Sequence, residues 1–164
     1  MTSEKDTVDS GTRSDARLFS IFTVLWAVAG WFHLWNQVPW PKLLWWRPDA
    51  SQMVMESLVL AGAWCVLARP GNAKVFLIFI ALEALHGLVE LPRVANHWYI
   101  TYLVNLAMLG SAAVVYRRDG RLDAVAWFRH FAPGARGIVW LAYSFSALAK
   151  LNTDFLDPSV SCAS

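Results

Sequence analysis

The amino-acid sequence predicts an all-α integral membrane bundle of about five transmembrane helices, with the N-terminus in the cytoplasm and the C-terminus outside. Three observations lead to this prediction. Hydrophobic residues make up 57% of the 164 residues and charged residues only 16%, a composition that is unusual for a soluble domain. The apolar residues lie in blocks that approach the ~20 residues a helix needs to cross a bilayer. Lys and Arg are concentrated in the loops on one side of these blocks.

Five apolar blocks define the predicted spans. The first sixteen residues are polar and charged, so we expect a disordered tail (1–16) followed by a transmembrane helical domain (17–164). The first block is too long for a cleavable signal peptide and is expected to remain as an anchor. The second and fifth blocks are short and would need tilt or help from their neighbours. In chain order, the blocks cover residues 18–38, 52–67, 75–91, 98–116 and 137–151.

The connection before the fifth block contains a short amphipathic stretch, residues 122–131. At helical spacing it places Ala126, Trp127 and Phe131 towards lipid and Arg129 towards water. The alternative interpretation is a simple linker that its aromatic side chains anchor at the membrane surface. Both interpretations leave this stretch outside the fifth span.

The distribution of basic residues predicts the orientation. With the N-terminus in the cytoplasm, ten Lys and Arg lie on the inner side and four on the outer side. The net charge of +2 is therefore a signal of sidedness and not of a nucleic-acid-binding surface. The inner set is Lys5, Arg13, Arg17, Arg69, Lys74, Arg117, Arg118, Arg121, Arg129 and Arg136, and the outer set is Lys42, Arg47, Arg93 and Lys150.

The two cysteines are predicted to lie on opposite sides of the membrane. Cys65 is near the inner end of the second block, whereas Cys162 follows the last block on the outside. They cannot come within the ~7 Å Cα separation that a disulfide requires. Cys162 is therefore expected to be free, paired with another chain or missing its partner.

Polar residues inside the predicted spans are the main candidates for a functional site, because ionisable groups are costly in lipid and usually face the bundle interior. The third block carries Glu83, His86 and Glu90 within one narrow helical face. His97 lies directly before the fourth block, and Asn105 lies within that block about two turns later. These spacings aim several polar groups in one direction.

The depth of these residues predicts a polar pocket that is open to the outside. Lys150 would lie about 21 Å from the inner surface in a straight helix, which is still within the hydrocarbon. With His33 and Glu56, all of these polar residues fall between the midplane and the outer face. Two alternatives remain open: His33, Glu56 and His97 only mark the interface, or Lys150 forms a structural ion pair with one of the deep glutamates, Glu83 or Glu90.

Other chemistries find less support in the sequence. The His and Glu residues lack an HExxH pattern and the chain has no Cys-rich spacing, so we predict no metal site. The glycine-containing stretches are not phosphate loops, and the Ser residues lack the GxSxG context of a hydrolase.

The closing residues carry a resemblance to a known family. The run YSFSALAKLNTDFLDP, residues 143–158, resembles the lysine-containing helix end of the vitamin K-dependent gamma-glutamyl carboxylase superfamily, whose transmembrane part is called the HTTM domain. The segment NHWYITYL, residues 96–103, is similar to that family's Asn-His-aromatic segment. The resemblance covers essentially the whole chain but only the first part of a typical member. It implies a truncated bacterial member in the cytoplasmic (inner) membrane.

The resemblance also implies a site and a cofactor. Lys150 would act as a base toward a reduced, vitamin K-like quinone, and His97 would assist it. The chain has Ala149, Lys150 and Asn152 where the eukaryotic enzymes have two consecutive lysines and an Asp. The large extramembrane portion that binds their protein substrate has no counterpart here. The expected pocket residues are Glu83, His86, Glu90, Asn105, Asn152 and Asp154.

Three functions remain open at this point. The first is a carboxylase-like or oxidoreductase-like membrane protein whose pocket around Lys150 binds a quinone or another lipophilic ligand, with or without catalysis. The second is a non-catalytic protein that assists an exported peptide or joins a second polypeptide supplying the missing C-terminal part. The third is a small proton-coupled transporter, since intramembrane Glu and His residues can relay protons. Each of them is expected to lie in the lipid bilayer, and none involves nucleic acid.

Overall fold

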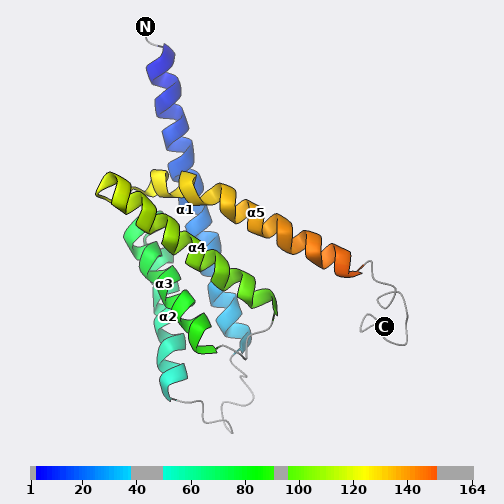
Figure 1. Ribbon diagram of the computed structural model, residues 1–164. Helices are drawn as coiled ribbons and strands as arrows, with labels where there is room; N and C mark the ends of the chain where they lie inside the picture. Colours follow the sequence, from blue (N-terminus) through cyan, green and yellow to red (C-terminus); the bar gives the residue numbers. More distant parts are fainter. Residues whose placement is uncertain (1–2, 38–49, 91–95, 151–164) are drawn as a thin grey trace.

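The structure is a computed structural model that describes the backbone of residues 3–37, 50–90 and 96–150, and the side chains of most residues within these ranges. This part of the chain consists of five α-helices and contains no strand (Figure 1). In chain order the helices are α1 (Ser3–Gln37), α2 (Ala50–Ala68), α3 (Ala73–Glu90), α4 (Asn96–Asp119) and α5 (Ala124–Lys150).

The all-helical class is confirmed, and helices cover each of the five apolar blocks. The fifth apolar block is part of a longer helix, because α5 begins at Ala124 and includes most of the amphipathic stretch as its first turns. Asp123 caps this helix: its Oδ1 accepts a hydrogen bond from the backbone N–H of Ala126 at 2.8 Å, which fixes the first turn. Pro133 lies inside the helix without ending it.

The polar N-terminal segment also differs from its predicted disorder, since α1 begins at Ser3 and runs without a break into the apolar block. Extending an existing helix costs far less than nucleating a new one. In addition, Arg129 of α5 forms a 2.6 Å ion pair with Asp15. The apolar block therefore supplies the nucleus from which the polar residues continue as helix.

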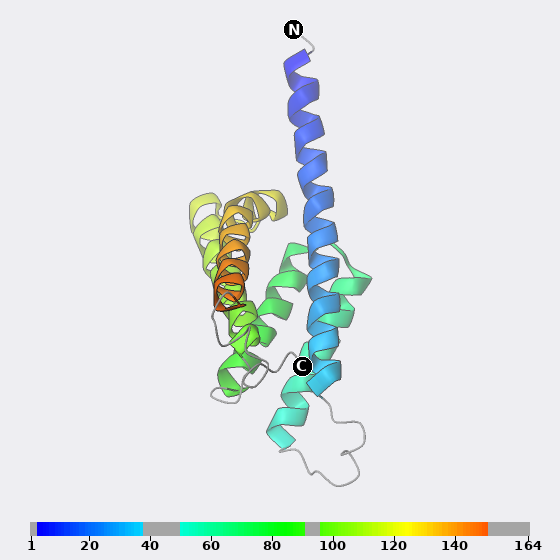
Figure 2. The same cartoon turned by 90° about the vertical axis from the view of Figure 1, so that its right-hand side faces the viewer.

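Consecutive helices run in alternating directions and pack against one another, and α5 packs on both α4 and α1 (Figures 1 and 2). The α2–α3 and α4–α5 connections lie at one end of the bundle, from which the N-terminal part of α1 projects. The α2–α3 turn touches α1 directly, because the N–H of Gly71 donates to Thr23 Oγ1 at 3.1 Å. Gly71 has a φ of 75°, a conformation that favours glycine.

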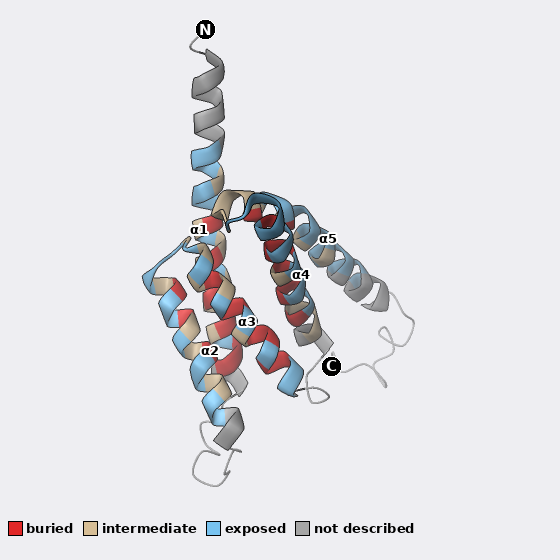
Figure 3. Ribbon diagram, turned by 60° about the vertical axis from the view of Figure 1, so that its left-hand side comes forward, coloured by how far each residue is buried: buried red, intermediate tan, exposed pale blue. Residues whose placement is uncertain are grey.

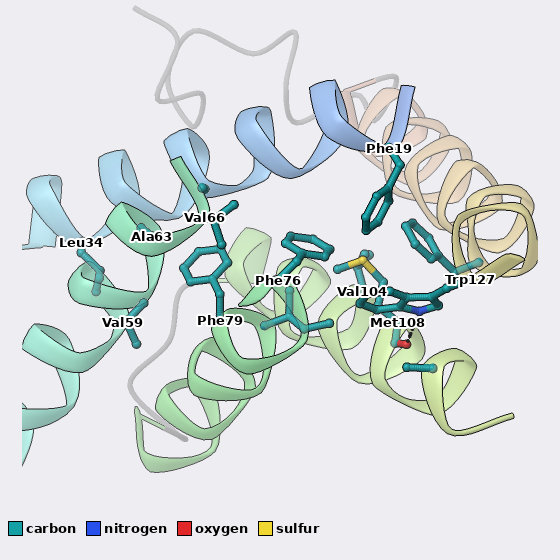
Figure 4. Packing of buried hydrophobic residues seen from close by; sticks show 14 residues of the cluster. Phe19, Leu34, Val59, Ala63, Val66, Phe76, Phe79, Val104, Met108 and Trp127 are labelled. Carbon is teal, nitrogen blue, oxygen red and sulfur yellow. Dashed lines mark hydrogen bonds between the residues drawn. The ribbon is translucent and has the colours of Figure 1, made fainter. Parts of the chain in front are cut away.

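The largest part of the core lies where α1, α3, α4 and α5 meet near this end (Figure 4). Phe19 and Phe76 pack with Trp127 at ring-centroid distances of 5.7 to 5.9 Å. The indole Nε1 of Trp127 donates to the backbone carbonyl of Met108 at 3.0 Å. Trp127 and Phe131 are buried, so the prediction that they face lipid was wrong. Their side chains fasten α5 to the bundle.

Burial has an unusual pattern in this protein. Figure 3 shows that buried residues line the faces where helices meet, while the outward faces are exposed. Large apolar side chains are exposed on every helix, including Leu25 at 63%, Trp64 at 61%, Ile78 at 61%, Leu103 at 58% and Trp140 at 75%. The buried polar residues are Thr23, His33, Glu83, His86, Asn105 and Ser111.

Two helical segments in the described ranges are long and apolar enough to cross a membrane, Thr12–Leu34 of α1 and Tyr99–Asp119 of α4. Met53–Ala68 of α2 is a shorter apolar helix. Core helices of soluble proteins can have the same length and composition. The exposure of large apolar side chains is therefore the more informative observation.

The second half of α5 leaves the bundle. It extends away from α3 and α4 towards Lys150 (Figures 1 and 3). Its side chains are correspondingly exposed, with Trp140 at 75% and Tyr143 at 73%. Only the first half of α5 therefore packs against α1 and α4.

Candidate functional site

A buried polar cluster lies between α1, α3 and α4. It consists of Trp26 and His33 from α1, Glu83 and His86 from α3, and Tyr102 and Asn105 from α4. All except the partly buried Trp26 have side chains that are at most 8% exposed. A cavity of about 80 Å³ lies within this cluster, and Val59 of α2 and Thr101 of α4 also line it.

Glu83 is the centre of the cluster. Its Oε2 accepts hydrogen bonds from Asn105 Nδ2 at 3.0 Å and from Trp26 Nε1 at 3.1 Å. The same indole N–H also lies 3.0 Å from Asn105 Oδ1, so it is shared between two acceptors. Glu83, Asn105 and Trp26 thus form a closed triangle that joins three helices. Such buried networks are stabilising only when their members are satisfied.

A second contact continues the cluster along the cavity. His33 Nε2 lies 3.4 Å from the hydroxyl of Tyr102, and their rings meet edge to face at 6.5 Å. His86 is 2% exposed and lines the same cavity one helical turn beyond Glu83. Two imidazoles, a phenol and a carboxyl group therefore surround one small space.

Two glycines allow the helices to approach closely at this site. A Cβ atom at Gly30 would collide with Glu83 Oε1 and would lie 3.0 Å from Phe79 Cζ. A Cβ atom at Gly87 would collide with the ring of Tyr102. Small residues at helix crossings are typical of helices that pack by close backbone approach. Gly30 and Gly87 thus make room for the two polar side chains of the site.

The size and lining of the cavity limit what it can hold. Its volume is about 80 Å³, roughly half of a 150 Å³ cavity that is large enough for benzene. It can hold a few water molecules or the hydroxyl-bearing edge of a ring. Its donors and acceptors suit a hydroxyl group, which needs one partner of each kind.

The structure brings together four of the polar residues from which the sequence analysis predicts a pocket: His33, Glu83, His86 and Asn105. Glu56 of α2 is partly buried and does not line the cavity. Glu83 lies nine residues after Lys74, about 14 Å along α3. The cluster therefore lies towards the end of the bundle that is opposite the α2–α3 and α4–α5 connections.

The remaining predicted site residues lie outside what the structure describes. Lys150 is the last residue of α5 and His97 lies in the first turn of α4, but neither side chain is described, nor is that of Glu90. Asn152, Asp154 and Cys162 lie beyond the described residues altogether. No described residue of α5 lines the cavity, and the half of α5 that leads to Lys150 extends away from the cluster (Figure 1). Among the described side chains, the predicted convergence is found for α1, α3 and α4.

The sequence analysis missed Trp26, Tyr102, Gly30 and Gly87. Trp and Tyr are partly apolar, so neither stands out within a hydrophobic block. One signal was available: Tyr102 and Asn105 are three residues apart, and Gly30 and His33 are also three apart, so each pair shares a helical face. A search for small residues one turn from buried polar residues would have found both glycines.

A second polar contact links α4 to α5 away from this cluster. Ser111 Oγ lies 2.8 Å from His130 Nδ1, beside a cavity of about 220 Å³ between the two helices. This contact and the Trp127 hydrogen bond hold the first half of α5 in place. Among the described residues, no group of three or more His, Cys, Asp or Glu side chains is arranged to hold a metal ion.

The comparisons with known proteins do not identify a family for this chain. No family model, no curated protein and no solved structure gives a significant match.

Proposed function

We propose that this chain is a five-span integral membrane protein that binds the polar end of a lipophilic ligand at the Glu83 cluster. The observation that carries the proposal is the exposure of large apolar side chains on the outward faces of all five helices, while a polar cluster lies inside the bundle. A soluble monomer rarely exposes large contiguous apolar patches. Lipid acyl chains would cover these apolar faces without a cost in free energy.

The positions of the basic residues support a membrane orientation. Apart from Arg136 and Lys150, every Lys and Arg in the described ranges lies in the N-terminal part of α1, at the α2–α3 turn, at the end of α4 or at the start of α5. These segments share one end of the bundle (Figures 1 and 2). An excess of Lys and Arg marks the cytoplasmic side. The Glu83 cluster would then extend from near the midplane of the bilayer, at Glu83, into its outer half, at His86 and His33.

A reduced quinone is the ligand class that we propose, and it rests on the resemblance to the carboxylase superfamily. A quinol presents hydroxyl groups on a lipophilic ring, and a hydroxyl can donate to Glu83 and accept from a neighbouring imidazole or phenol. With a cavity of about 80 Å³, only the hydroxyl-bearing edge of the ring would enter. The roles of Lys150 as base and His97 as its assistant remain part of this proposal on the same resemblance.

Ligand binding can be tested with the purified protein in lipid nanodiscs. Titration with a reduced naphthoquinone should quench Trp fluorescence, because the indole of Trp26 bonds the proposed ligand-binding carboxyl group. Glu83→Gln should weaken binding about tenfold or more, since a carboxyl group makes stronger hydrogen bonds than an amide. Glu56→Gln is the matched control, the same change away from the cavity, and should bind like the wild type. Equal affinities for all three proteins would disprove the proposed site.

The lysine proposal needs a separate variant. Lys150→Ala should fold and insert but lose any quinone-dependent activity if Lys150 is the base. An unchanged phenotype would favour the non-catalytic protein that assists an exported peptide or a second polypeptide.

Proton movement is a second candidate, because Glu83, His86 and His33 line one cavity that is large enough for water. Intramembrane Glu and His residues commonly form proton relays. Liposomes that contain the protein and a pH-sensitive dye would show proton uptake that depends on Glu83. Uptake that Glu83→Gln leaves unchanged would rule out this function.

A further inference from the structure

A second, apolar groove runs along the outside of the bundle between α1 and α5. Its volume is about 420 Å³, within the range of small-molecule sites. Residues of α1 such as Ile21, Phe22 and Leu25 form one wall, and Phe131 and Trp140 of α5 form the other. The groove exists because α5 packs on α1 only through its first half and then turns away.

Arg136 is the one charged residue among the described residues that line this groove. It is exposed and makes no hydrogen bond or ion pair with any residue that the structure describes. Phe131 packs against Phe22 at a ring-centroid distance of 5.3 Å, which places Phe131 about one turn inside the first apolar block. Arg136 lies five residues further along α5, about 7 Å along the helix axis. An arginine at this depth needs an anionic partner or a path to the headgroups.

The charge around the groove is positive at its shallow end. Arg17 lies one turn before Ile21 on the same face of α1, and Arg129 lies two turns before Arg136 on the same face of α5. The carboxylate of Asp15 neutralises part of this charge through its ion pair with Arg129. Of these groups, Arg136 lines the groove itself, and Arg17 and the Arg129–Asp15 ion pair lie one to two helical turns from residues that line it. This is charge complementarity for an anionic headgroup attached to an acyl chain.

We propose that the groove binds an anionic phospholipid, with one acyl chain between α1 and α5 and its phosphate at Arg136. The inference rests on the membrane insertion that we propose above and on nothing in the Glu83 cluster. Arg136 would bind the phosphate oxygens through its planar guanidinium, which suits two-point recognition. The lipid would fill the space that α5 leaves open and would hold its diverging half against α1.

Native mass spectrometry of the purified protein can test the proposal. The protein is incubated with equal amounts of phosphatidylglycerol and phosphatidylcholine, and the lipid that stays bound is identified. Phosphatidylglycerol should remain preferentially on the wild type. Arg136→Gln should reduce its retention about fivefold, the factor expected for one basic residue beside anionic lipid, whereas Arg136→Lys should retain most of it. Arg121→Gln, an exposed arginine on the α4–α5 connection, is the matched control and should behave like the wild type.

A variant that blocks the groove without changing its charge provides the second test. Val139 lines the groove and is 47% exposed, so Val139→Trp should fold and should reduce the retention of both lipids. Equal losses in Arg136→Gln and Arg121→Gln would overturn the proposal, because they would indicate a general charge effect. Mass spectra that show a second copy of the chain bound in place of lipid would overturn the proposal as well. Failure of the wild type to enter the membrane fraction would refute the proposed function, whereas insertion without lipid preference would refute this inference alone.

Discussion

Gly30→Ala is the change that tests the architecture of the polar site most directly. The new methyl group would collide with Glu83 Oε1 and would lie 3.0 Å from Phe79 Cζ and 3.3 Å from Glu83 Cδ. The carboxyl group of Glu83 is the end of a flexible side chain, so this group would move before the backbone does. Its movement would break the hydrogen bonds from Trp26 and Asn105, which join α1 and α4 to α3.

The magnitude follows from the contacts that are lost and gained. Interhelical hydrogen bonds in membrane proteins contribute on average about 0.6 and at most about 1.7 kcal/mol each, so two bonds amount to roughly 1 to 3 kcal/mol. Crowding by one extra methyl group typically costs about 1 to 3 kcal/mol. Replacing Gly by Ala in a helix returns about 1 kcal/mol. The free energy of unfolding should therefore fall by roughly 3 kcal/mol.

Unfolding in mixed micelles, followed by Trp fluorescence during titration with a denaturing detergent, would measure this difference. Gly110→Ala is the matched control, because nothing lies within 4 Å of a Cβ atom at that position in α4, and it should be neutral or slightly stabilising. In the Glu83→Ala background the Gly30→Ala penalty should shrink to less than half, since the colliding atoms are gone. An equal penalty with and without Glu83, or one no larger than that of Gly110→Ala, would refute the close packing of α1 on Glu83.

Three further predictions follow from single contacts and can be measured by the same unfolding assay. Gly87→Ala should destabilise the protein by about 1 to 3 kcal/mol, because the methyl group would displace the ring of Tyr102; a wild-type stability would contradict the crossing of α3 and α4. Trp127→Phe should lower the free energy of unfolding by about 1 to 3 kcal/mol, the usual effect of leaving a buried group without its hydrogen bond. Trp140→Phe, at a 75% exposed position, should change it little. A larger loss for Trp140→Phe than for Trp127→Phe would contradict the buried position of Trp127. Asp123→Ala should cost about 1 kcal/mol through loss of the helix cap, and Asp123→Asn should recover most of it; a neutral alanine variant would mean that α5 does not depend on this cap.

Much of the fold could be predicted from the order of polar and apolar residues. The ends of α2, α3 and α4 lie within a few residues of the ends of the predicted spans. The same holds for the C-terminal end of α1, whose N-terminal end extends into the polar segment. The start of α5 could not be predicted in this way, because Arg129, His130, Pro133 and Arg136 interrupt the apolar residues of this stretch. Its Trp127 becomes core only because Phe19 and Phe76 from distant helices surround it.

The candidate site was predicted in part. Glu83, His86 and Asn105 stood out because polar residues are rare within apolar blocks, and the structure places all three at one cavity or in its hydrogen-bond network. The expected centre, Lys150, was inferred from depth along a straight fifth span and from the family resemblance, and its side chain lies outside what the structure describes. Since α5 starts earlier and its second half leaves the bundle, depth along the helix alone did not determine which residues it would approach.

The sequence by itself determined most of the helical segments and which polar residues interrupt the apolar blocks, because both properties depend on local composition and spacing. Only the tertiary structure decided which polar residues meet, since that depends on where helices approach closely enough for side chains to touch. Gly30 and Gly87 allow this approach because they leave room for the side chains of Glu83 and Tyr102. The role of such a glycine can be recognised only when the residues that pack against it are known. The same reason applies to the groove at Arg136, which arises from the direction that α5 takes after its contact with α1.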